Sequence, residues 1–155
     1  MQLLSLCYLF RGLSESQLHR LSAVAKEVQI QKGQLLMHEG ERAEELFVVK
    51  EGAVELLSKV EDGFELPIAI LRNPGSCTGT SALVAPYVYS LSARCAEEGT
   101  MLVIKRVDLQ KLIMEDCGLG FTVMTNLAQH LLDRLKETRQ ELKLHFKTLF
   151  KSSHH

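Results

Sequence analysis

The stretch LMHEGERAEELFVVKEG, from Leu36 to Gly52, decides the fold. Its apolar run Leu46-Phe47-Val48-Val49 lies between two glycines, each of which follows a glutamate. A short apolar run bounded by turn residues predicts a β-strand. We therefore expect a strand here, with turns at Glu39-Gly40 and Glu51-Gly52.

Further short apolar segments lie on both sides of this strand. In chain order, the candidate strands are LLMH, ELFVVK, AVELLSKV, LPIAIL, SLSARCA and TMLVIK. Further turn signals stand at Lys32-Gly33, Asp62-Gly63, Asn73-Pro74-Gly75 and Glu98-Gly99, and Asp62-Gly63 suits a tight hairpin. Strands spaced so closely predict a mainly β, α+β fold, with an antiparallel β-roll or jelly roll (a double-stranded β-helix) over residues 27–106.

Helical patterns flank the predicted roll. Ser14 and Gln17 form the pattern of a capping box, which predicts an N-terminal helix over residues 14–26. A short helix is expected over 107–117, with Asp108 near its start, and a long helix over 121–150, which contains no Gly or Pro. At 1.5 Å per residue the long helix would extend about 45 Å, too far to lie wholly against a small barrel.

The long helix carries a heptad seam, whose members recur in steps of four and three. These residues are Met124, Ala128, Leu131, Leu135, Thr138, Leu142, His145 and Leu149. A seam sustained to the end of the helix predicts pairing with a second copy, so we expect a homodimer.

Composition and length limit the class of protein. The 155 residues include 18 Lys and Arg and 19 Asp and Glu, so the net charge of −1 favours neither nucleic acid nor an anionic membrane. No apolar run is long enough to span a bilayer, and the first residues do not form a signal peptide. Cys7, Cys77, Cys95 and Cys117 are scattered, which indicates neither a zinc site nor a disulfide framework. We expect a cytoplasmic protein of one domain, residues 1–150, with 151–155 a tail or tag remnant; the position of Met1 favours a complete protein.

The order of elements and the Leu36–Gly52 motif resemble the cyclic-nucleotide-binding domain, the effector module of the catabolite activator protein family. Gly40, Glu41, Ala43, the apolar run and Gly52 fit the family pattern, while Met37 stands where a smaller aliphatic residue is usual. The resemblance covers roughly residues 9–145. NPGSCTG is similar to the approach to the family's phosphate-binding cassette, which we place at Pro74–Ser92 and call the cassette.

The resemblance implies how a cyclic nucleotide would be held. In the family, Gly-Glu opens a short helix whose backbone amides face the phosphate, and an Arg about ten residues later neutralises it. Alignment places Gly79 at the family's Gly, Thr80 at the Glu position and Ser90 at the Arg position. Losing two charged partners weakens binding by about 3–6 kcal/mol, or about 10² to 10⁴ in affinity.

The candidate ligand-binding residues supply amides and hydroxyls instead of charges. They are Gly79, Thr80, Ser81, Ala82, Ser90, Leu91, Ser92 and, on the long helix, Thr138. Arg94 is an alternative phosphate ligand, and Tyr87 or Tyr89 could cover the ligand or simply close the loop. The candidate ligands are cyclic AMP or cyclic GMP, bound weakly, or another small anion.

Two function hypotheses follow. The first is a stand-alone sensory module that binds a small ligand in the roll and signals through the long helix to a partner protein. The alternative is a ligand-free scaffold for dimerisation or protein–protein interaction. No enzyme motif or metal-binding spacing is present, a haem held by His38 and Cys77 has little support, and too few residues follow the long helix for a DNA-binding helix-turn-helix.

Overall fold

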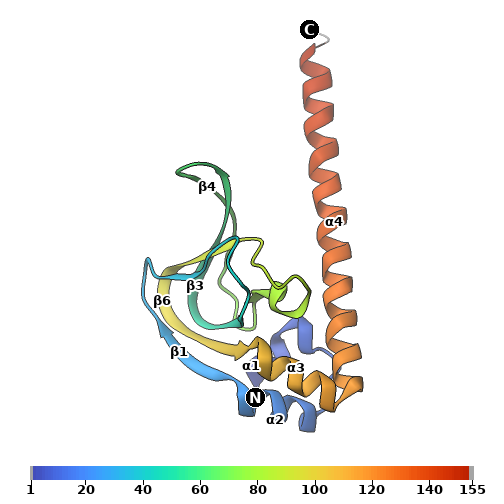
Figure 1. The fold of residues 1–155 in the computed structure, drawn as a ribbon. Helices are drawn as coiled ribbons and strands as arrows, with labels where there is room; N and C mark the ends of the chain where they lie inside the picture. The colour runs from blue at the N-terminus through green and yellow to red at the C-terminus, as the bar shows by residue number, and fades with distance from the viewer. Residues whose placement is uncertain (1, 154–155) are drawn as a thin grey trace.

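The computed structural model describes residues 2–153 of the chain. The strands form one sheet, and helices lie at its base (Figure 1). In chain order the elements are α1 (Gln2–Leu6), η1 (Tyr8–Phe10), α2 (Glu15–Val24), β1 (Lys26–Ile30), β2 (Leu35–Met37), β3 (Glu45–Glu61), β4 (Phe64–Leu71), β5 (Cys77–Thr78), η2 (Thr80–Leu83), β6 (Ser92–Lys105), α3 (Arg106–Glu115) and α4 (Cys117–Ser153).

The strands form an antiparallel β-roll. The sheet order is β1-β6-β3-β4, with β2 also paired to β6 and β5 also paired to β3. The Asp62-Gly63 hairpin is confirmed, because Glu61 pairs with Phe64 across it. The predicted fold class, an α+β roll with an N-terminal helix and a long C-terminal helix, is therefore confirmed.

Two predicted turns are bends inside long strands. Residues 45–50 and 53–60 belong to the single strand β3, and 92–96 and 100–105 belong to β6. The register between β3 and β6 shifts around Gly52, whose φ is 93°. A Cβ at Gly52 would lie 2.6 Å from the carbonyl oxygen of Glu97, so the missing side chain lets the two strands bend together around the roll.

The apolar run in β3 is buried on both faces. Leu46 and Val48 pack in a core between the sheet and the helices, together with Phe10, Leu109 and other residues. Phe47 and Val49 point the other way, into the core of the roll. Successive residues of a strand face opposite sides, so an unbroken run of four apolar residues is what a strand between two cores requires.

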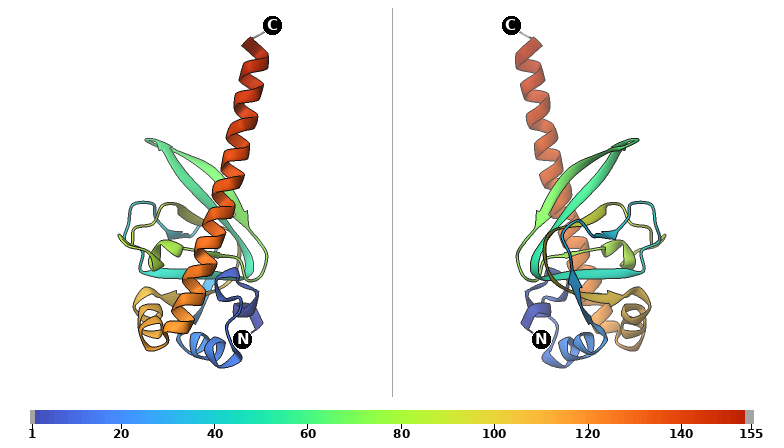
Figure 2. Two further views of the ribbon diagram at one scale, coloured as in Figure 1. Left: turned by 90° about the vertical axis from the view of Figure 1, so that its right-hand side faces the viewer. Right: turned by 90° about the vertical axis from the view of Figure 1, so that its left-hand side faces the viewer.

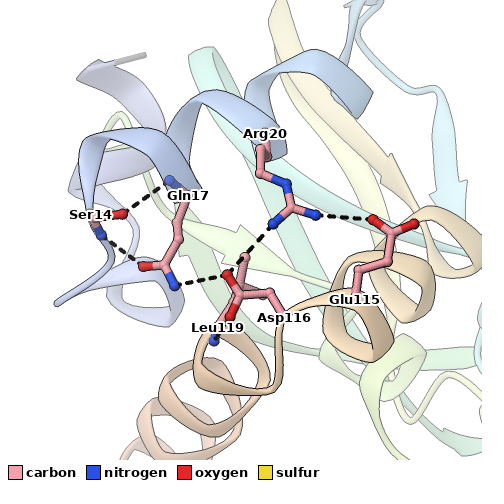
Figure 3. Close-up of polar contacts among 6 residues, drawn as sticks. All are labelled: Ser14, Gln17, Arg20, Glu115, Asp116 and Leu119. Carbon is pink, nitrogen blue, oxygen red and sulfur yellow. Dashed lines mark hydrogen bonds and ion pairs between the residues drawn. The ribbon is translucent and has the colours of Figure 1, made fainter.

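The helices at the base of the roll meet at a polar junction (Figure 3). Ser14 and Gln17 form the predicted capping box of α2. Gln17 also donates to the Asp116 carboxylate at 3.1 Å, and the Leu119 amide donates to the same carboxylate at 3.1 Å. Asp116 thus joins α2 to the start of α4, and Arg20 reinforces the junction by pairing with Glu115 at 3.0 Å.

α4 starts earlier and ends later than the predicted long helix. It spans 37 residues from Cys117, because the Asp116 side chain caps its first turn, and Gly118 lies inside the helix. Residues 151–153 continue it, while His154 and His155 of the predicted tail lie outside the described residues. Figure 2 shows its C-terminal half extending beyond the roll. No helix in the described range 2–153 combines the length and apolar character needed to cross a bilayer.

The heptad seam of α4 is exposed in the single chain. The side chains that hold α4 to the core, among them Leu119, Val123 and Leu127, lie on a different face. Leu131, Leu135, Leu142 and Leu149 are 53%, 45%, 56% and 67% exposed. Exposed leucines at heptad spacing are typical of a helix that pairs with another helix.

Candidate functional site

A cavity of about 390 Å³ lies between the roll and α4. This volume is in the range of small-molecule sites. Its walls come from η1, β2, β3, β4, the cassette and α4. The lining residues are Tyr8, Met37, Leu56, Ile68, Ala69, Leu71, Ser76, Cys77, Thr78, Gly79, Thr80, Ser81, Ser90, Leu91, His130, Leu131 and Arg134.

The cassette forms the polar wall of this cavity. Gly79, Thr80, Ser81, Ser90 and Leu91 of the predicted site all line it. Gly79 stands at φ 88° just before η2, and a Cβ there would lie 2.8 Å from the Glu45 carbonyl oxygen. Only glycine fits this position without strain, so the chain can pass close to β3 and turn into η2 at the cavity wall.

Three of the predicted site residues lie outside the cavity. The Ala82 amide donates to the Gly79 carbonyl within η2, and the Ala82 side chain is fully buried. The Ser92 hydroxyl accepts from the Glu39 amide at 2.9 Å, which fixes the neighbouring loop. Thr138 lies on the exposed part of α4, where its hydroxyl donates to the Arg134 carbonyl at 2.9 Å. In the single chain, Thr138 is not among the residues that line the cavity.

The two tyrosines of the cassette leave the cavity open. The Tyr89 hydroxyl donates to the Glu45 carbonyl at 2.8 Å and accepts from the Glu45 amide, so this ring anchors the cassette to β3. The Tyr87 ring lies under the guanidinium of Arg106, 4.9 Å from its centroid. Neither ring is among the cavity-lining residues.

α4 and η1 form the opposite wall. The rings of Tyr8 and His130 are stacked, with centroids 4.0 Å apart and planes at 19°. The Asn126 side-chain amide, one turn earlier, donates to the carbonyls of Leu9 and Arg11, both at 2.9 Å. These contacts fix η1 on α4, and the helix then presents Leu131 and Arg134 to the cavity.

Arg134 carries the only formal charge among the described residues that line the cavity. Its guanidinium lies 3.2 Å from the Glu137 carboxylate, and both side chains are largely exposed. Burial lowers the pKa of His130, with help from the charge on Arg134, so the imidazole is neutral at pH 7. Burial likewise raises the pKa of Tyr8, whose phenol stays protonated.

Two neighbouring thiols lie at the cassette wall, one lining the cavity and one buried. Cys77 lines the cavity and shares a hydrogen bond with the buried Cys7, and this bond together with burial raises the pKa of the Cys77 thiol. The Cys77 thiol is thus protonated at neutral pH and adds no charge. The four cysteines of the chain form no disulfide.

The other candidate ligands do not face the cavity. Arg94 pairs with Glu65 at 3.3 Å and is absent from the lining, so it does not replace the family's Arg. His38 is exposed and hydrogen bonds to the Glu39 carbonyl, and it does not line the cavity, whereas Cys77 does. Within residues 2–153, no cluster of His, Cys, Asp and Glu suits a metal ion.

Sequence reasoning missed Tyr8, His130 and Arg134. Their place in the site depends on how α4 crosses the roll, and no local motif marks that crossing. A partial signal exists, because the helical face that buries Val123 and Leu127 continues to His130 and Arg134 in steps of three and four.

An antiparallel roll with a long C-terminal helix packed against it is the fold of catabolite-activator-like cyclic-nucleotide-binding proteins. A sequence model of the cyclic nucleotide-binding domain matches residues 27–116, and the chain belongs to this family. The chain is 28% identical to the anaerobic regulatory protein of Bacillus subtilis over 127 aligned residues. This alignment covers 82% of this chain and 53% of that protein. The chain therefore spans about half the length of that curated relative.

Solved structures agree with this assignment. The catabolite activator protein of Thermus thermophilus is 28% identical with a TM-score of 0.75, over 88% of this chain and 62% of that one. The N-terminal domain of a transcriptional regulator from Streptomyces coelicolor is 27% identical with a TM-score of 0.73, over 84% of this chain and 93% of that one. One of these two structures is thus a catabolite activator protein, and the other is a domain of a transcriptional regulator.

Proposed function

We propose that the chain is a sensory module that binds a small ligand in the cavity between cassette and α4, with weakened recognition of cyclic nucleotides. The observation that carries the proposal is the shared lining of the cavity. Thr80 and Ser90 of the cassette and Arg134 of α4 face the same space. A ligand that contacts both walls favours one position of the helix over others, which is the requirement for a ligand-driven change.

Weak binding of cyclic nucleotides follows from the charges at the site. No carboxylate lines the cavity within the described chain, so nothing there replaces the acid that accepts from a ribose hydroxyl. Ser90 offers a neutral hydroxyl where the family has a guanidinium. A site of about micromolar affinity would weaken towards about millimolar through these two losses.

The signal would leave through α4. The exposed leucines of the seam support a homodimer in which the helices of two copies pair. A ligand that shifts α4 would then alter the surface that the dimer presents to a partner protein. We propose no catalytic role.

Isothermal titration calorimetry with cyclic AMP and cyclic GMP tests this function. We expect saturable binding with a dissociation constant of about 1 mM, in agreement with a cavity that keeps its amides but lacks the charged pair. Micromolar binding would contradict the weakened recognition. Complete absence of nucleotide binding at about 10 mM would contradict any recognition of cyclic nucleotides, and absence of binding of other small anions as well would favour the scaffold for dimerisation.

A further inference from the structure

We infer that the cavity takes a small carboxylate with an apolar body, and that Arg134 on α4 binds its charged group. This inference rests on the proposed function, since it concerns the ligand of the same cavity. It differs from the family's mode of binding in two respects: the ligand needs no sugar, and the positive charge is on the helix instead of on the roll.

The charge at the cavity determines the sign of the ligand. Arg134 supplies one positive charge, and Tyr8, Cys77 and His130 are neutral at pH 7. A cavity with one guanidinium and no carboxylate selects an anion, because an ionised ligand oxygen accepts strong hydrogen bonds from a guanidinium. A cationic ligand would have no partner there.

The remaining lining determines the body of the ligand. Apolar side chains come from every part of the roll that faces the cavity, including Met37 of β2, Leu56 of β3, Ile68 of β4 and Leu91 of the cassette. Leu131 of α4 adds to them, and the stacked rings of Tyr8 and His130 also line the cavity. An apolar body of a ligand gains from contact with this lining, whereas a ribose would leave hydroxyls without a charged acceptor.

The position of Arg134 links this charge to the long helix. It is the last residue of α4 that lines the cavity, and every described residue after it is exposed. Asn126 and His130 hold the helix to η1 up to this level. A ligand bound to Arg134 therefore acts where the anchored part of α4 ends and the pairing seam continues.

The present partner of Arg134 is weak enough to be displaced. Its pair with Glu137 joins two largely exposed side chains on one helix surface, and exposed pairs of this kind contribute little to stability. A ligand carboxylate on the cavity side can thus compete with Glu137 at small cost. Removing the Glu137 charge should make Arg134 more available.

Titration with 4-phenylbutyrate and with its neutral amide, 4-phenylbutyramide, tests the inference, with cyclic AMP as the phosphodiester. We expect 4-phenylbutyrate to bind at least as tightly as cyclic AMP and at least about tenfold more tightly than the amide, because only the acid gains a charged hydrogen bond. Equal affinity for acid and amide, or tighter binding of cyclic AMP, would overturn the inference. Failure of both phenylbutyrate probes to bind would also overturn it.

Variants of the full chain identify the residue responsible. Arg134→Gln should weaken 4-phenylbutyrate about tenfold and leave the amide unchanged, and Arg134→Lys should restore part of the loss. Arg139→Gln removes the same charge from the same helix outside the cavity lining and should have no effect. Glu137→Gln should tighten the acid slightly.

The results separate this inference from the proposed function. Binding of cyclic AMP near the cassette with no effect of Arg134→Gln on any probe would reject Arg134 as the ligand's partner and leave the sensory module intact. Absence of binding of every probe would reject both. Circular dichroism of each variant shows whether a loss reflects unfolding, and unchanged binding of the amide provides a second check of an intact cavity.

Discussion

Restoring the family's charged pair should restore recognition of cyclic nucleotides. Thr80 and Ser90 both line the cavity, so the double variant Thr80→Glu with Ser90→Arg would bring a carboxylate and a guanidinium to the wall where the family has them. Each hydrogen bond to a charged group contributes about 1.5–3 kcal/mol, and the pair therefore about 3–6 kcal/mol. Ser90 is exposed, and solvent screens charges there, so we expect the lower end, a gain of about 100-fold for cyclic AMP.

Isothermal titration calorimetry of wild type and variant measures this gain. The control is Thr80→Gln with Ser90→Gln, which adds polar side chains without charge and should give little improvement. The gain should also shrink as salt is raised, since charge contributes most of it. A folded double variant with less than about a threefold gain would refute the alignment of the cassette on which the reasoning rests.

Three further predictions concern the dimer, the helix junction and the cassette. Leu135→Glu places a charge in the proposed helix pair and should give a monomer in analytical ultracentrifugation; a dimer of unchanged stability would reject pairing through the seam. The hydrogen bond from Gln17 lowers the pKa of Asp116, so its carboxylate stabilises the fold above the pKa of the unfolded chain, about 3.9, and this contribution is lost as the pH falls through the folded pKa. Urea denaturation at several pH values should therefore show that the free energy of unfolding falls less at acid pH for Asp116→Asn than for wild type. Equal decreases in the two proteins would contradict the role of the junction. In the same assay, Gly79→Ala should lower the free energy of unfolding more than Gly33→Ala does. The two glycines have φ of 88° and 89°, so alanine brings a strain of about 1–2 kcal/mol at either position. Of the two, only position 79 would bring the new Cβ against a backbone carbonyl oxygen, at 2.8 Å.

The sequence was sufficient for the fold because the local signals agree with one another. The Leu36–Gly52 motif, the Asp62-Gly63 hairpin and the capping box at Ser14 are each local features whose geometry follows from residue type. The turn signal at Gly52 was misleading for a physical reason. Glycine permits both a chain reversal and a bend inside a strand, and only pairing with β6 selects the bend.

Only the cassette wall of the candidate site could be predicted, because its residues lie in one contiguous stretch of sequence. The cassette residues Gly79, Thr80 and Ser90 line the cavity. Arg134 could not be found in this way, because its contact with the cavity depends on the crossing of α4, and Arg134 is not a member of the heptad seam. Ser92 was predicted to contact a ligand, but its hydroxyl accepts a hydrogen bond from the Glu39 amide and thus holds the neighbouring loop.

An NMR titration tests the central claim, that one ligand contacts the cassette and the long helix together. Backbone amide signals of ¹⁵N-labelled protein would be followed while 4-phenylbutyrate or cyclic AMP is added. The account predicts saturating shifts with one dissociation constant for Thr80 and Ser81 in the cassette and for His130 and Arg134 on α4. Shifts confined to one of the two walls, or centred elsewhere on the protein, would contradict it.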